Sequence, residues 1–159
     1  MKKLIIGLVV LAMVSLSLPV SAGNTDTITV TLSPQATIDI SVSPDSWTPT
    51  ASLNHSDNTT TTYFTIDTLD TDVNISIDVK ASNTADWTIG DTASHDVFVL
   101  GITPNGGSET ELTTSDQTIW DDVSPGNDPQ FGLNLDMPTT SSTSQDQTVT
   151  ITFTASALA

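Results

Sequence analysis

Acidic side chains are the residues of this chain best placed to do chemistry. Asp121, Asp122 and Asp128 crowd one short stretch, and Asp67, Asp70 and Asp72 crowd another. Carboxylate oxygens from a short loop are the ligands that calcium prefers. Neither stretch has the spacing of a helix–loop–helix calcium site, so a solvated acidic turn is the alternative. If calcium binds this chain, we expect it at Asp121, Asp122 and Asp128, because Pro and Gly residues between them favour a loop that folds back on itself.

Three tryptophans offer a second kind of site. Trp47, Trp87 and Trp120 each stand beside a predicted strand. Exposed indole rings would form a platform for a glycan, whereas buried rings would fill the core. We expect Trp87 to be a core residue and leave both roles open for Trp47 and Trp120.

Catalysis has little support in the sequence. The two histidines, His55 and His95, lie in polar stretches, and no zinc-binding His-Glu-x-x-His motif or serine-nucleophile motif is present. The chain has no cysteine, so thiol chemistry and disulfides are excluded. We therefore expect no enzyme and no cofactor. Three Asn-x-Ser/Thr triplets, at Asn54, Asn58 and Asn74, are candidates for glycosylation.

The first 22 residues have the pattern of an export signal. Two lysines precede an apolar run of a length too short to span a membrane comfortably, and small residues follow at Val20-Ser21-Ala22. We expect cleavage after Ala22, a secreted or cell-surface protein, and no membrane span in residues 23–159. The formal charge of the whole chain is −16, and loss of Lys2 and Lys3 leaves one lysine against 19 acidic residues, a charge of −18. Nucleic acid is excluded as an expected partner because phosphate binding requires a basic surface.

Period-two alternation dominates the rest of the sequence. Residues 73–80 alternate branched apolar and polar side chains, and residues 37–42, 63–66, 131–137 and 148–154 repeat the pattern, while residues 97–102 are apolar on both faces. We expect residues 67–72 to form a hairpin, residues 50–61 and 121–129 to be loops, and Leu112 and Ile119 to point inward. No helical periodicity is sustained. The prediction is a single all-β domain at residues 23–159, an antiparallel immunoglobulin-like β-sandwich of about seven to nine strands.

The first alternating segment has two interpretations. Residues Thr27, Ile28, Thr29, Val30, Thr31 and Leu32 form a regular strand that Pro34 separates from the rest. The strand can pair within its own sandwich, or residues 23–33 can be donated to a neighbouring subunit. Head-to-tail donation builds an open filament. The sequence leaves both pairings open. It therefore also leaves open whether the protein is a homopolymer or a monomeric module that binds a glycan or calcium.

The overall layout resembles a family of fibre-forming proteins. The signal ending at Val20-Ser21-Ala22, the strand at residues 27–32 and the closing strand at residues 148–153 are similar in arrangement to those of secreted, cysteine-free, Thr-rich sandwich subunits: the camelysin-like biofilm matrix proteins and the archaeal bundling pili. The resemblance implies a structural subunit of an extracellular filament or surface layer. Some members of that family have been called metalloproteases, and this chain lacks the zinc-ligand motif for that role.

Overall fold

A computed structural model describes residues 29–32 and 35–158 of the chain. The contacts divide the chain into two units, Met1–Ser33 and Pro34–Ala159, and all ten strands lie in the second unit. The described residues contain no helix, and no helix long and apolar enough to cross a membrane occurs among them. The expectation of an all-β chain without helices is confirmed for this part of the sequence.

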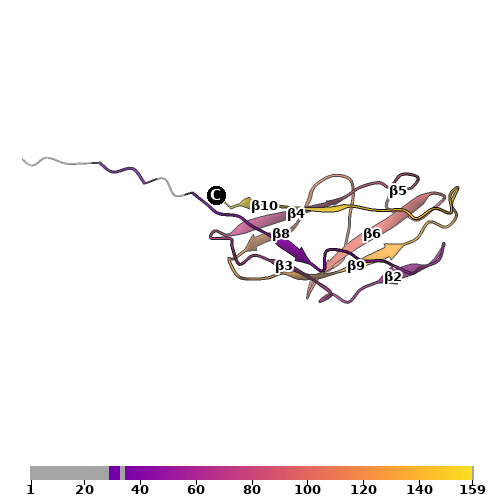
Figure 1. The fold of residues 1–159 in the computed structure, drawn as a ribbon, viewed down its shortest axis with the longest axis horizontal. Coiled ribbons are helices and arrows are strands. Elements are labelled where there is room, and N and C mark those ends of the chain that lie inside the picture. The colour runs from indigo at the N-terminus through magenta and orange to yellow at the C-terminus, as the bar shows by residue number, and fades with distance from the viewer. Residues whose placement is uncertain (1–28, 33–34, 159) are drawn as a thin grey trace, which may run out of the picture. The chain divides into compact units, whose positions relative to one another are not determined.

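The strands form two sheets (Figure 1). The larger sheet has the order β1-β3-β9-β6-β5, with β2 also paired to β9 and β7 to β6. The smaller sheet has the order β10-β4-β8. All pairs are antiparallel except β5 with β6. The strands of the larger sheet are β1 (Ser41–Ser43), β2 (Ser56–Asn58), β3 (Phe64–Asp67), β5 (Thr88–Ile89), β6 (Val97–Pro104), β7 (Thr110–Glu111) and β9 (Gln130–Asp136); those of the smaller are β4 (Ile75–Ala81), β8 (Gln117–Val123) and β10 (Ile151–Ala157).

The apolar faces of both sheets meet in one core. In β4 the residues alternate between buried and partly buried along the whole strand, as the sequence pattern predicts. β6 is buried at five consecutive positions because it lies inside the larger sheet, between β9 and the short strands β5 and β7. Phe131 of β9 stacks on Phe64 with ring centroids 5.0 Å apart and also contacts the rings of Trp120 and Phe153, so it joins the two sheets. A β-sandwich-like arrangement follows.

Several predicted segments are corrected by the structure. Residues 67–72 do not form a hairpin: β3 belongs to the larger sheet and β4 to the smaller, so the segment crosses between sheets. The crossing lets the apolar faces of both strands point into the same core. β2 lies within residues 50–61, which we expected to be a loop, and β8 continues to Val123, inside the expected loop 121–129. β1 and β10 each begin later than predicted. Leu112 is buried as expected, and Ile119 is partly buried.

Candidate functional site

β10 leaves one side of the smaller sheet open. It pairs with β4 in an unbroken register from Ile151 with Ala81 to Ala157 with Ile75, and no other strand of the described residues pairs with it. Alternate backbone N–H and C=O groups of an edge strand point away from its partner and offer hydrogen bonds to an added strand. β10 contains no charged residue and no proline. Its core-facing residues Ile151, Phe153 and Ala155 are only partly buried, so the core is incompletely covered here.

The opposite edge of the same sheet is protected. β8 pairs with β4 through two register shifts, and Asp122 at one of them has a φ of 111°. Asp121 and Asp122 are both exposed on this strand. Bulges and charged side chains are the features by which natural sheets prevent edge-to-edge pairing. Within residues 29–32 and 35–158, the smaller sheet therefore has one protected edge and one edge that no strand, bulge or charge covers.

A groove opens between the sheets beside the start of β10. Its volume is about 640 Å³. The buried core residues Leu133 and Leu135 line it, and so do the partly buried Val149 and Ile151. Trp47 and Trp87 also line it, each partly buried. Trp87 thus packs against the core as expected, but it has a solvent-facing side as well.

A polar loop forms another wall of the groove. Residues Gln145 to Thr148 line it, and Gln147 holds them in place. The side-chain oxygen of Gln147 accepts hydrogen bonds from Thr84 Oγ1 at 2.7 Å and from the Asp86 backbone N–H at 3.1 Å. Its side-chain N–H donates to the Asp86 carboxylate at 3.0 Å. This wall is therefore fixed to the turn that precedes Trp87.

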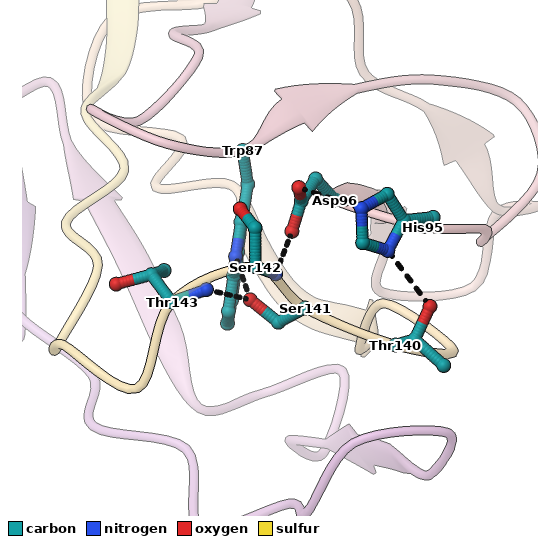
Figure 2. Close-up of polar contacts among 7 residues, drawn as sticks. All are labelled: Trp87, His95, Asp96, Thr140, Ser141, Ser142 and Thr143. Carbon is teal, nitrogen blue, oxygen red and sulfur yellow. Dashed lines mark hydrogen bonds and ion pairs between the residues drawn. The ribbon is translucent and has the colours of Figure 1, made fainter.

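Hydrogen bonds also orient the Trp87 indole (Figure 2). Its Nε1–H donates to Ser141 Oγ at 2.8 Å. Ser141 Oγ accepts a second hydrogen bond, from the backbone N–H of Thr143 at 3.1 Å. A buried indole N–H normally finds such an acceptor. The ring is thus held in one orientation at the side of the groove.

Asp96 ties the same loop to the turn before β6. Asp96 has a φ of 55°, a left-handed conformation, and its Oδ1 accepts the backbone N–H of Ser142 at 2.8 Å (Figure 2). Its own backbone N–H donates to the carbonyl of Thr140 at 3.0 Å. The hydrogen bonds from Ser142 lower the pKa of the Asp96 carboxyl below its ordinary value, with smaller contributions from Ser141 and from the charge of His95. The ionised carboxylate therefore stabilises this loop connection.

His95 stands between a carboxylate and a hydroxyl, an arrangement that the sequence did not predict. Its Nδ1 lies 2.9 Å from Thr140 Oγ1, and its Nε2 lies 3.2 Å from the Asp96 carboxylate. Such an order of groups can pass a proton between hydroxyl and imidazole. The imidazole is 64% exposed, and neither His95 nor Thr140 lines the groove. We assign the three residues to holding the loops together. The two loops are far apart in sequence, so no spacing rule could have found them.

The predicted calcium ligands are not brought together. Asp128 Oδ1 accepts hydrogen bonds from the backbone N–H of Thr68 at 3.0 Å and from its hydroxyl at 3.3 Å. Asp122 accepts a hydrogen bond from Asn74 Nδ2 at 2.7 Å. Asp121 and Asp122 line a second hollow of about 360 Å³ that does not include Asp128. No group of three metal-ligating side chains occurs in residues 29–32 and 35–158.

The other predicted site residues are dispersed. Trp120 lines the second hollow, so the three tryptophans do not form one platform. Asn54 and Asn58 are exposed, and the amide of Asn74 is exposed although it is bonded to Asp122. Of the predicted donor strand, Thr27 and Ile28 lie outside the described residues.

The remainder of that donor segment is described. Residues 29–32 are not part of a strand, and Val30 and Leu32 are 71% and 84% exposed. Lys80, the single basic side chain after Lys3, pairs with Asp116 at 3.0 Å. Comparisons of this chain with protein-family models, with curated protein sequences and with solved structures found no match.

Proposed function

We propose that this chain is a secreted structural protein, the subunit of an extracellular filament or surface layer that assembles by β-strand exchange. In this proposal residues 1–22 are a cleaved signal peptide, residues 23–159 form an immunoglobulin-like sandwich, and residues 23–33 carry the donated strand. The unprotected edge of β10 is the observation on which the proposal rests most. The exposed, alternating segment at residues 29–32 supplies the other half of the contact.

Deletion of residues 23–33 tests the need for this segment. The mature protein should form linear particles in negative-stain electron microscopy, and the deletion variant should not.

Two point variants of equal charge test which face of the donated strand makes the contact. Val30→Asp places a carboxylate on the apolar face and should abolish assembly, whereas Thr31→Asp places it on the opposite face and should not. Normal filaments from Val30→Asp, or equal loss from both variants, would contradict strand exchange through this face.

The two tryptophans of the groove favour a second candidate function, a glycan-binding module. Trp47 and Trp87 stand beside the polar groups of Thr84 and Gln147, the mixture of aromatic surface and hydrogen-bonding groups typical of a ligand site. Tryptophan fluorescence during titration with a glycan library measures such binding. Calorimetry with calcium tests the metal alternative at the same time, and no response in either assay would remove the binding module.

A further inference from the structure

We infer that the side chains of Thr84 and Gln147 become joined by an intramolecular ester, formed with loss of ammonia from the glutamine amide. This inference is independent of the proposed strand exchange. It assigns a covalent modification site to a chain that has no cysteine for a disulfide. Lys80, the only lysine in the part of the chain that the structure describes, pairs with Asp116 instead, so the nucleophile beside Gln147 is a hydroxyl.

The two side chains meet just beyond the end of the β4–β10 pairing. The backbone N–H of Ser82 donates to the Thr150 carbonyl at 2.9 Å, and the Thr150 N–H donates to Ser82 Oγ at 3.0 Å. The two segments therefore stay side by side after the strands end. A short way further along them, the hydroxyl of Thr84 donates to Gln147 Oε1 at 2.7 Å, in a partly buried position.

The turn that follows Thr84 orients its hydroxyl. Thr84 Oγ1 accepts the backbone N–H of Trp87 at 2.8 Å, and the backbone N–H of Thr84 donates to the Trp87 carbonyl at 3.0 Å. The hydroxyl proton has two acceptors within reach, Gln147 Oε1 and the Trp87 carbonyl oxygen at 3.2 Å. A nucleophile held in this way has little freedom left to lose in the reaction, which raises its effective concentration.

The carbonyl group of Gln147 is positioned for attack. Its oxygen also accepts the backbone N–H of Asp86 at 3.1 Å. This N–H would stay bound to the oxygen while a nucleophile adds and would stabilise the negative charge that develops there. With a carbonyl bond of about 1.2 Å, Thr84 Oγ1 lies about 3–4 Å from the amide carbon, near the separation at which reacting atoms are aligned.

The amide nitrogen of Gln147 is held beside a proton carrier. Its N–H groups donate to the Asp86 carboxylate at 3.0 Å and to the Gln145 carbonyl at 3.3 Å. In the reaction, Thr84 Oγ1 forms a bond with the amide carbon and the bond from this carbon to nitrogen breaks. The hydroxyl proton passes to the nitrogen through the Asp86 carboxylate. The products are the ester and one ammonia, so the step needs no oxidant and no cofactor.

The ester would tie the turn before β5 to the segment before β10. The two residues are 63 positions apart in the sequence. Closing so long a loop stabilises a fold by restricting the unfolded chain, as a disulfide does. Among the described strands β10 pairs with β4 alone, so the link would also prevent β10 from detaching at this end.

Intact-mass spectrometry of the purified full chain tests the ester. We expect a mass lower by one ammonia than the sequence requires. Digestion on the N-terminal side of aspartate should yield residues 78–85 linked to residues 146–159. Hydroxylamine cleaves esters under conditions that leave amides intact, so it should separate these two peptides.

Four variants locate the link. Thr84→Val removes the nucleophile and should keep the full mass, whereas Thr84→Ser retains a hydroxyl and should still lose ammonia. Gln147→Glu should abolish the loss of ammonia. Gln145→Glu, at an exposed glutamine of the same loop, is the matched control and should not. Hydroxylamine should lower the thermal midpoint of the wild type by about 10 °C and leave that of Thr84→Val unchanged.

Three results would overturn the inference. The first is a mass equal to that of the sequence, in fresh protein and after prolonged incubation. The second is conversion of Gln147 to glutamate, which would show that water and not Thr84 attacks the amide. The third is a loss of ammonia that persists in Thr84→Val, because it would then come from another residue, such as Asn105 before Gly106.

Discussion

Replacement of Asp128 separates a structural role of this carboxylate from a role in calcium binding. Thr68 is completely buried, and its backbone N–H and hydroxyl both donate to Asp128 Oδ1. Asp128→Ala removes this acceptor and leaves the buried Thr68 N–H without a partner. The loss of such an acceptor costs about 1–3 kcal/mol, because the donor remains desolvated. With a urea m value of about 2 kcal/mol per M, a loss of about 2 kcal/mol lowers the unfolding midpoint by about 1 M.

The assay is urea unfolding followed by tryptophan fluorescence, with and without calcium. Asp128→Asn keeps a side-chain oxygen and should lose much less stability than Asp128→Ala. Asp121→Ala removes an exposed carboxylate from the same part of the chain and should change the stability by no more than about 0.5 kcal/mol. In a Thr68→Val background the effect of Asp128→Ala should be smaller, because the hydroxyl donor is already absent.

Two results would refute this reasoning. Equal stability of Asp128→Ala and wild type in the absence of calcium would show that the Thr68 bonds contribute nothing. Stabilisation of the wild type by calcium that both Asp121→Ala and Asp128→Ala abolish would show that the carboxylates share a metal ion instead.

Two further predictions concern the loop connection and the core. The Asp96 carboxyl has a lowered pKa, so its stabilising effect is complete above the ordinary pKa of about 4 and is lost as the pH falls through the lower, folded-state value. Asparagine tolerates the left-handed backbone at this position, so Asp96→Asn tests the charge alone. The variant should have a lower thermal midpoint than wild type at pH 6, and the difference should shrink below about pH 4. Phe131→Ala removes the ring that joins both sheets and should cost about 3–5 kcal/mol in chemical unfolding, whereas Tyr63→Ala, at a ring that is 46% exposed, should cost much less.

Strands with a strong two-residue period could be predicted from the sequence, and those without it could not. β4 and β9 follow their alternation closely because each has one face on the core. β2 has the sequence Ser-Asp-Asn and carries no apolar signal. It forms through backbone pairing with β9 and a side-chain bond from Ser56 to Asp136. Gly132 of β9 allows the segment after β2 to approach β9 closely. A Cβ atom at residue 132 would lie 2.7 Å from the carbonyl oxygen of Thr60.

The candidate site could be predicted only in part. The pattern of residues 27–32 predicts a strand, but the described residues 29–32 are exposed and lie outside any strand. The groove was not predicted, because Trp47, Trp87 and Gln147 come together through loops whose course depends on tertiary contacts. The hydrogen bonds of the acidic stretch at residues 121–128 could not be predicted either. Asp128 accepts its bond from Thr68 and Asp122 from Asn74, both far away in the sequence.

The crossing of residues 67–72 between the sheets has a consequence for how the domain folds. β4 cannot pair with β3, its neighbour in sequence, and instead lies between β8 and β10. During synthesis, β4 lacks both of its pairing partners until those two later strands have left the ribosome. Folds dominated by such distant pairings have high contact order and fold slowly, in milliseconds to seconds. The nascent chain should therefore remain unfolded until most of it has been synthesised.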